Sequence, residues 1–254
     1  MSRQRLDVEL VRRGLAASRA QAKRLIITQQ VVVIGGGPPR PSSVVATETV
    51  IEVVGGQRRW VSRGAEKLLA ALEAFPIDLA GKRVLDVGAS TGGFTEVVLD
   101  AGASQVVAVD VGRGQLHQRL REDPRVLAFD QTNIRHVSPQ ELGAPFPAIV
   151  VDVSFISLST IAPHLASLAG DMADLVVLVK PQFEVGRSNL GHGGVVRDPA
   201  TRARAVVTVV NALAGSGLGA QGLIRSPLEG GDGNVEYLLW LRKGATGVAM
   251  RVPA

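Results

Sequence analysis

The chain has 254 residues, of which 46% are hydrophobic and 20% are charged, a composition typical of a soluble globular protein with one large domain and one small one. It has no cysteine, which excludes disulfides and thiolate metal sites, and its apolar stretches fall short of the ~18 residues that a membrane span needs. The N-terminus is polar and basic rather than like a signal peptide, so we expect a cytoplasmic protein without a membrane span.

The net charge of +5 is unevenly distributed along the chain. Residues 1–67 contain 12 Lys and Arg against 5 Asp and Glu, whereas residues 68–254 contain 16 against 18. A basic N-terminal quarter indicates a polyanionic partner such as a nucleic acid. The alternative is a basic surface that is merely solvated.

Helical and strand patterns succeed one another in the N-terminal quarter. We expect two helices and two short strands, over 6–17, 19–29, 31–34 and 49–54. The first helix repeats leucines at helical spacing, and Ser18 is a suitable N-cap for the second. These elements define a domain over 1–56 and a linker over 57–63. We expect nucleic-acid phosphates to be bound by Arg3, Arg5, Arg19, Lys23 and Arg24.

From residue 64 onward, a helix is followed by alternating apolar strands and helical segments. Such alternation predicts an α/β domain over 64–254 with a mostly parallel, doubly wound, Rossmann-like sheet. The last two strands, near 222–225 and 235–241, are expected to form an antiparallel edge hairpin. Five strands end in a charged residue, at Asp86, Asp110, Asp130, Asp152 and Lys180. The carboxyl ends of parallel strands share one edge of a sheet, so these five side chains are predicted to line a common crevice.

The turn after the first strand of this domain resembles a nucleotide-binding turn but departs from the dinucleotide fingerprint. In Gly-x-Gly-x-x-Gly the middle glycine lets a pyrophosphate approach the backbone, and here that position is Ser90. Asp86, two residues before Gly88, would also repel a pyrophosphate. An acid there suits a ligand with a cationic end, and we favour S-adenosylmethionine over a nicotinamide cofactor or a turn without ligand.

The expected cofactor contacts follow from this interpretation. Asp110 is placed for ribose hydroxyls and Asp130 for the adenine amine. The full predicted set comprises the turn and the two following strand ends: Asp86, Gly88, Ser90, Thr91, Gly92, Phe94, Asp110, Val111 and Asp130.

Two lysines and two carboxylates remain, namely Lys67, Asp152, Lys180 and Glu236. They could be surface ion pairs, which are common and contribute little. However, Lys180 follows five apolar residues and precedes Pro181, so its stem is expected to be buried and its amine directed at the crevice. A neutral lysine amine at that place could accept a proton.

Six segments carry a resemblance to a known family, and they span essentially the whole chain in order. They read RLDVELVRRGL at 5–15, VSRGAEKL at 61–68, DVGASTGGFT at 86–95, VDVSFIS at 151–157, VKPQFE at 179–184 and GNVEY at 233–237. The chain resembles the TlyA proteins, hemolysin-A-like ribosomal RNA 2′-O-ribose methyltransferases in which an S4 RNA-binding domain precedes an FtsJ-like catalytic domain.

The resemblance implies that Lys67, Asp152, Lys180 and Glu236 form the family's catalytic tetrad, with Lys180 contacting and deprotonating a ribose 2′-hydroxyl. It also implies S-adenosylmethionine as cofactor, ribosomal RNA or ribosomal subunits as partner, cytidine as the modified nucleotide and no metal. Asp130 departs from the family pattern, which has a glutamate there. A monomer is favoured. The alternatives are a membrane-active, hemolysin-like protein and an RNA-binding protein with an inactive methyltransferase domain.

Overall fold

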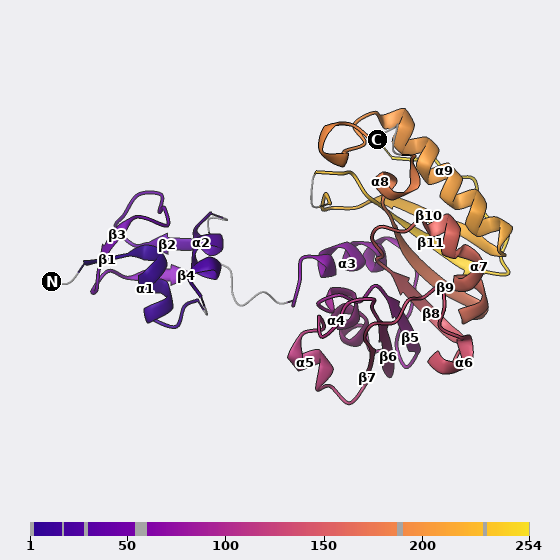
Figure 1. Ribbon diagram of the computed structural model, residues 1–254, viewed down its shortest axis with the longest axis horizontal. Coiled ribbons are helices and arrows are strands. Elements are labelled where there is room, and N and C mark those ends of the chain that lie inside the picture. Colours follow the sequence, from indigo (N-terminus) through magenta and orange to yellow (C-terminus); the bar gives the residue numbers. More distant parts are fainter. Residues whose placement is uncertain are drawn as a thin grey trace. The chain divides into compact units, whose positions relative to one another are not determined.

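The computed structural model describes residues 3–16, 18–27, 30–53, 60–186, 190–230 and 233–253, without the side chains of Arg24 and His192. The chain divides into two compact units, Met1–Arg59 and Trp60–Ala254 (Figure 1). The predicted phosphate contact of the Arg24 side chain and residues 57–59 of the predicted linker therefore lie outside the described part.

The N-terminal unit packs two short helices against two strand pairs. Helices α1 (Leu6–Arg12) and α2 (Arg19–Ile27) are accompanied by two antiparallel pairs, β1 (Arg3–Arg5) with β3 (Val44–Ala46) and β2 (Val31–Val33) with β4 (Ile51–Val53). Its core includes Leu6, Leu10 and Ile26. The first helix ends five residues before the predicted end, because Gly14 adopts a left-handed φ of 70° just beyond it.

Two carboxylates of α1 are fully buried and organise the arginines of this unit. Asp7 accepts from Arg5 at 3.0 Å and from Arg19 at 3.1 Å, while Glu9 accepts from two further arginines of α1 and its end. Both arginines bound to Asp7 remain about half exposed. Two of the predicted phosphate contacts are thus held in place by an internal carboxylate, with guanidinium surface still open to solvent.

These buried carboxylates predict an acid-sensitive N-terminal unit. The hydrogen bond from Arg5 holds the pKa of Asp7 down at about 2, and the bond from Arg12 does the same for Glu9, against the opposing effect of burial. Because both folded-state pKa values lie below the ordinary values of 3.8 for Asp and 4.5 for Glu, the stabilisation is complete above about pH 5 and is lost as the pH falls towards 2. Amide hydrogen exchange in α1 of the full chain should therefore accelerate between pH 5 and pH 2.5 beyond the intrinsic rate change. A variant with both Asp7→Asn and Glu9→Gln should lack this pH dependence, and equal protection of wild-type α1 at the two pH values would contradict the assignment.

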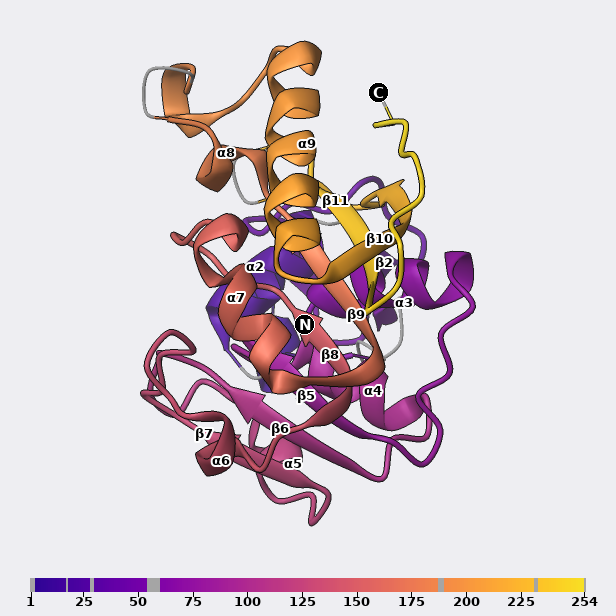
Figure 2. The ribbon, with the colours of Figure 1, turned by 90° about the vertical axis from the view of Figure 1, so that its right-hand side faces the viewer.

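A seven-stranded sheet forms the centre of the C-terminal unit (Figure 2). Its spatial order is β10-β11-β9-β8-β5-β6-β7, and β11 is antiparallel to both of its neighbours, whereas the pairs from β9 to β7 are parallel. In chain order the strands are β5 (Arg83–Val87), β6 (Gln105–Val109), β7 (Val126–Phe129), β8 (Phe146–Val151), β9 (Ala169–Val179), β10 (Leu218–Arg225) and β11 (Tyr237–Lys243). The predicted Rossmann-like sheet with an antiparallel hairpin is confirmed.

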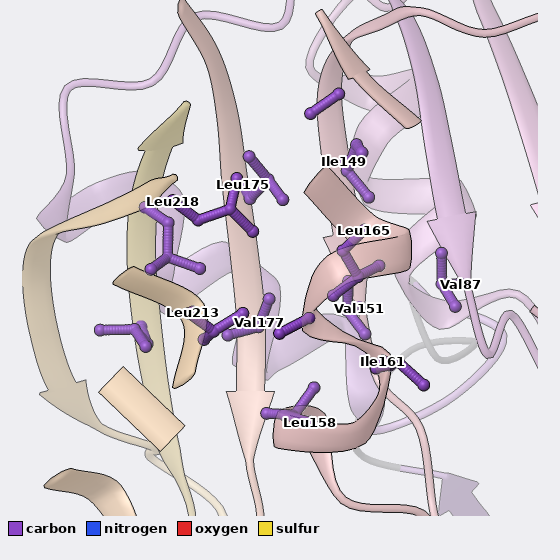
Figure 3. Packing of buried hydrophobic residues seen from close by; sticks show 14 of the residues in the cluster. Val87, Ile149, Val151, Leu158, Ile161, Leu165, Leu175, Val177, Leu213 and Leu218 are labelled. Carbon is purple, nitrogen blue, oxygen red and sulfur yellow. The ribbon is translucent and has the colours of Figure 1, made fainter. Parts of the chain in front are cut away.

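Helices cover both faces of this sheet, as the alternation of buried side chains requires. Along β8, Ile149 and Val151 point into one core cluster and Ala148 and Val150 into the other. The first cluster packs under α7 (Leu158–Leu168) and α9 (Pro199–Gly215), as Figure 3 shows, and the second under α3 (Gly64–Ala74) and α4 (Gly93–Asp100). Short helical segments complete the unit, namely α5 (Gln118–Arg121), α6 (Pro139–Leu142), α8 (Pro181–Glu184) and η2 (His192–Gly194).

The hairpin of β10 and β11 enters the sheet in an order that the chain does not suggest. The later strand, β11, lies between β9 and β10, so the earlier strand forms the edge. Val248 donates to the carbonyl of Ala220 at 2.8 Å, which covers part of that edge with the C-terminal segment. The position next to β9 brings the residue before β11, Glu236, beside the carboxyl end of β9.

Candidate active site

A pocket with a volume of about 430 Å³ opens at the carboxyl edge of the sheet. Its walls are the segments that follow β5, β6, β7 and β8. The predicted site residues among its lining are Gly88, Ser90, Asp110, Val111 and Asp152. Parallel strands bring these residues together although they are separated by up to 64 positions in the chain.

Gly88 lets the turn after β5 pass directly against the loop after β8. Its φ is 86°, and a Cβ atom there would lie 2.3 Å from the backbone oxygen of Asp152. Its amide donates to the carbonyl of Val109 at 2.8 Å, which ties the same turn to the end of β6. A side chain at position 88 is therefore incompatible with the observed backbone.

Asp110 fixes two loops at once. Its Oδ2 accepts from the amide of Ser90 at 2.8 Å, and its Oδ1 accepts from the amide of Gly112 at 2.7 Å. Each carboxylate oxygen retains capacity for a further donor. Asp110 thus presents acceptor positions to the pocket at a place suited to ligand hydroxyls.

Asp86 is a fully buried carboxylate with one unpartnered oxygen. Its Oδ2 accepts from the hydroxyl of Thr95 at 2.6 Å, while Oδ1 has no hydrogen-bond partner. Burial, reinforced by the charges of Asp152 and Asp110, raises the pKa of Asp86 to about 7, against the opposing hydrogen bonds from Thr95. A nearby cation would relieve this unfavourable environment for the charged form.

Replacing Asp86 with Asn should stabilise the protein at alkaline pH. Because the folded-state pKa of Asp86 is about 7 and the ordinary value for Asp is 3.8, ionisation of the wild-type residue lowers the free energy of unfolding as the pH rises from 4 through 7. Asn keeps the shape and can accept from Thr95, so the variant should have a higher Tm than wild type at pH 8.5, and the difference should narrow towards pH 5. The expected gain is on the order of 1.4 kcal/mol for each unit by which the pKa is raised. A Tm difference that does not change between pH 5 and pH 8.5 would show that Asp86 is not perturbed in this way.

Asp86, Thr91, Gly92 and Phe94, which were predicted to contact the cofactor, are not among the residues that line the pocket. Phe94 packs in the core cluster beneath α3 and α4, and Gly92, with a φ of 97°, is the N-cap of α4. Thr91 is exposed beside the turn and is not among the lining residues. These positions shape the turn, and direct ligand contacts from them remain predictions.

The carboxylate of Asp130 is engaged away from the pocket lining. Both its oxygens accept from Arg121, at 2.9 and 2.8 Å, and the amide of Gly114 donates at 3.1 Å. The hydrogen bond from Gly114 and the guanidinium of Arg121 lower its pKa. Thr132 and Asn133, just beyond it, line the pocket instead. The adenine contact of Asp130 therefore stays a prediction, and sequence reasoning missed the two polar residues that follow it.

Lys180 is held by two groups from the loop after β8. Its Nζ lies 2.6 Å from Oδ1 of Asp152, an ion pair without hydrogen-bond geometry, and it donates to Oγ of Ser154 at 2.8 Å. The lysine is only 8% exposed, as its apolar strand predicted. Phe183 places its ring centroid 6.0 Å from the same nitrogen.

Lys67 and Glu236 form a second lysine–carboxylate pair. Nζ of Lys67, on α3, donates to Oε2 of Glu236 at 2.5 Å, and both side chains are largely buried. Gly230 packs against this pair, since a Cβ atom there would lie 2.6 Å from Oε1 of Glu236. A buried pair of this kind is more than a surface contact, because removing either partner leaves a charge poorly solvated.

The sheet register brings the two pairs to one place. Tyr237 of β11 is paired with Val179 of β9, so Glu236 and Lys180 occupy the next register positions on neighbouring strands. Adjacent strands are about 4.8 Å apart. The four predicted catalytic residues thus meet at the carboxyl ends of β8 and β9, and Asp152 belongs both to them and to the pocket lining.

Sequence reasoning also missed an exposed aromatic side chain at the pocket. Phe155 is 91% exposed, has a φ of 63°, lines the pocket and packs on Phe183 with ring centroids 5.1 Å apart. A positive φ is unusual for a bulky residue, and here the aromatic ring is also exposed to solvent. The signal available was its place in the segment VDVSFIS, directly after Asp152 and Ser154.

Within the described ranges, no helix is both long and apolar enough to cross a membrane. The same ranges contain no group of three or more His, Asp or Glu side chains placed to hold a metal ion.

Comparison with known proteins identifies the family. The model of the FtsJ-like methyltransferase family matches residues 60–243. The 16S/23S rRNA (cytidine-2′-O)-methyltransferase TlyA of Mycobacterium tuberculosis is 53% identical over 241 residues, which cover 94% of this chain and 90% of that protein. The chain belongs to the TlyA group of FtsJ-like methyltransferases.

Solved structures agree with membership of the TlyA group. A structure described as a putative hemolysin from Streptococcus thermophilus is 39% identical, with a TM-score of 0.76, and the match covers 97% of this chain and 90% of that one. A putative S-adenosylmethionine-dependent methyltransferase from Listeria monocytogenes shares the fold with a TM-score of 0.53 at 17% identity, over 72% of this chain and 99% of that one. The FtsJ-like unit described above is therefore a methyltransferase fold.

Proposed function

We propose that this TlyA-group protein uses S-adenosylmethionine to methylate the 2′-hydroxyl of cytidine in ribosomal RNA in the cytoplasm. The observation that carries the proposal is the convergence of two lysine–carboxylate pairs at the edge of the sheet where the pocket opens. The name of the Mycobacterium tuberculosis relative supplies the substrate class, at 53% identity over 94% of the chain.

The pocket residues fit the proposed cofactor. Asp86, buried behind the pocket lining, has an orphaned oxygen and a raised pKa, so a cationic group held in the pocket would favour its charged form. Asp110 offers acceptor capacity for ribose hydroxyls. Gly88 lets the turn after β5 lie directly against the loop of Asp152, which shapes the pocket between them. When bound, S-adenosylmethionine supplies a methyl group on a positively charged sulfur.

The chain's own residues would remove the proton of the attacking hydroxyl and stabilise the charge that results. In its neutral form the amine of Lys180 would accept this proton, so that the 2′-oxygen can take the methyl group that bound S-adenosylmethionine would supply, with the sulfur–methyl bond breaking and the sulfur leaving as a neutral thioether. The carboxylate of Asp152, at 2.6 Å, then stabilises the ammonium that results. Lys67, paired with Glu236, stands beside this group and is proposed to orient the ribose. Alignment of the attacking oxygen with the methyl group of a bound cofactor would contribute further to the rate.

The N-terminal unit is proposed to be an S4-like RNA-binding domain that supplies affinity through phosphate contacts. Arg3 and Lys23 are exposed, and Arg5 and Arg19 are presented by the buried carboxylate of Asp7. Contacts of this kind position the RNA without reading its sequence. Affinity for RNA should therefore fall steeply as the salt concentration rises.

A methyl-transfer assay tests the proposed function. The purified protein, in whatever oligomeric state it adopts, is incubated with tritiated S-adenosylmethionine. Small and large ribosomal subunits are supplied as substrates in separate reactions. The modified nucleotide is then mapped by 2′-O-methyl-sensitive reverse transcription. Label in a cytidine ribose supports the proposal, whereas label only on a base, or none on either subunit, contradicts it.

A further inference from the structure

We propose that Ser154 is a positioning residue for Lys180. The hydroxyl of Ser154 fixes the rotation of the lysine amine, so that the lone pair of the neutral amine faces the ribose. This inference rests on the proposed function, because it assumes that Lys180 takes the proton of the attacking hydroxyl. Ser154 belongs neither to the two lysine–carboxylate pairs nor to the turn that follows β5.

The contacts around the amine define its orientation. Nζ of Lys180 donates to Oγ of Ser154 at 2.8 Å and lies 2.6 Å from Oδ1 of Asp152. Ser154 lines the pocket, whereas Lys180 is 8% exposed. The serine therefore occupies the boundary between the nearly buried amine and the space where a substrate can enter.

A lysine nitrogen has three tetrahedral positions besides its bond to the side chain. In the neutral amine two positions hold protons and the third holds the lone pair. The hydrogen bond to Ser154 fixes one N–H, while Oδ1 of Asp152, 2.6 Å from the nitrogen but without hydrogen-bond geometry, attracts the amine through its charge. With that N–H fixed, the lone pair can be held in the direction of the ribose. Removing the hydroxyl removes this hydrogen bond, and rotation about the last carbon–nitrogen bond then lets the lone pair leave the productive direction.

Ser154 can act in this way because its loop is held independently of Lys180. Two residues of α8 contact the part of the loop that follows Ser154. Phe183 packs on Phe155, and Glu184 accepts from Oγ of Ser157 at 2.6 Å and from the amide of Leu158 at 2.8 Å. The hydroxyl of Ser154 is thus presented from a backbone that other contacts have already placed.

The charged groups around the amine come from three further elements. Asp152 follows β8, Glu236 precedes β11 in the neighbouring register position, and Lys67 of α3 is paired with Glu236. Hydrogen bonds to charged donors are stronger than those to neutral ones. Loss of the serine acceptor should therefore favour the neutral amine and move the midpoint of the pH–kcat profile to lower pH, while the charges of the other three groups stay as they are.

A matched pair of substitutions isolates the hydroxyl. Ser154→Thr and Ser154→Val have side chains of nearly the same shape, and the exposure of this position leaves room for either. Single-turnover methyl transfer to the ribosomal subunit that wild type modifies is measured from pH 6 to pH 10, together with the KM for that subunit. Ser157→Ala, three residues further along the same loop, is the control for a purely structural effect, and Lys180→Ala tests the underlying function.

We expect Ser154→Val to lower kcat by about tenfold or more with little change in KM, and to shift the midpoint of the pH profile downward. Ser154→Thr should stay within about threefold of wild type, and Ser157→Ala should lower Tm without moving the midpoint. Equal activity and equal pH profiles of the Thr and Val variants would overturn the inference while leaving the proposed function intact, provided that Lys180→Ala is inactive. Wild-type turnover by Lys180→Ala would instead refute the proposed function itself.

Discussion

Replacing Lys180 with Ala is expected to lower methyl transfer by at least about a hundredfold, while cofactor binding changes little. The amine is the group placed to take the hydroxyl proton, held 2.6 Å from Asp152 and 2.8 Å from Ser154. It is not among the residues that line the pocket, so its loss should spare the affinity for S-adenosylmethionine. Isothermal titration calorimetry and single-turnover transfer measure the two quantities separately.

Two further variants sharpen the test of Lys180. Lys180→Met fills the space of the stem without an amine, so it should be as inactive as Lys180→Ala even where the alanine variant is less stable. Lys243→Ala is the matched control, because Nζ of Lys243 donates to the carbonyl of Ala169 at the opposite end of β9. Activity of Lys180→Met close to wild type would rule out proton transfer to this amine.

Introducing Ala at Gly88 is expected to abolish measurable cofactor binding. The added Cβ atom would lie 2.3 Å from the backbone oxygen of Asp152, closer than any van der Waals contact, and the φ of 86° is unfavourable for any residue with a side chain. The loop carrying Asp152 must move away, which also separates that carboxylate from Lys180. Both calorimetric binding and methyl transfer should therefore be lost together.

Gly102 supplies a control that matches the backbone of Gly88. It has the same φ of 86°, but a Cβ atom there would meet only Ala80, at an ordinary 3.5 Å. Gly102→Ala should therefore lower Tm through the strained backbone and leave binding unchanged. If Gly88→Ala binds S-adenosylmethionine as well as Gly102→Ala does, the close approach of the two loops is not required by the site.

The positions of the site were predictable wherever a strand delivers a residue to the edge of the sheet. Asp110, Asp152 and Lys180 each directly follow an apolar strand, and parallel strands must place such ends together. Asp86 differs from the prediction, because β5 continues to Val87 and leaves this carboxylate inside the strand and fully buried. The periodicity that predicts the strands therefore also predicts which side chains can meet, without knowledge of their partners.

The pairing of these residues could not be predicted in the same way. Lys67 meets Glu236 across 169 positions, because β11 enters the sheet beside β9 rather than at the edge. Local pattern says nothing about that choice of neighbour. For Asp130 the position was predicted but the partner was not. It follows a strand as expected, yet its carboxylate accepts a hydrogen bond from Arg121, a basic residue on the short helix α5 before it.

The backbone conformation of the loops that follow the strands could also not be predicted from the hydrophobic pattern of the sequence. Nothing in the segment VDVSFIS predicts that Phe155 has a positive φ or that Ser154 faces Lys180, because both depend on the anchoring of the loop by Phe183 and Glu184. In the N-terminal unit, β1 and β3 are three residues long and were not recognised, and the burial of Asp7 and Glu9 depends on arginines that look like surface charge.

The insertion of β11 has a consequence for synthesis on the ribosome. Before the ribosome has synthesised Glu236 and the strand β11 that follows it, β9 lacks the neighbour with which it pairs on one side. Lys67 then also lacks the carboxylate to which it donates a hydrogen bond. A nascent or prematurely terminated chain can thus form the cofactor turn and most of the parallel strands yet lack a finished reaction centre. The set of two lysine–carboxylate pairs is therefore complete only when β11 has taken its place between β9 and β10.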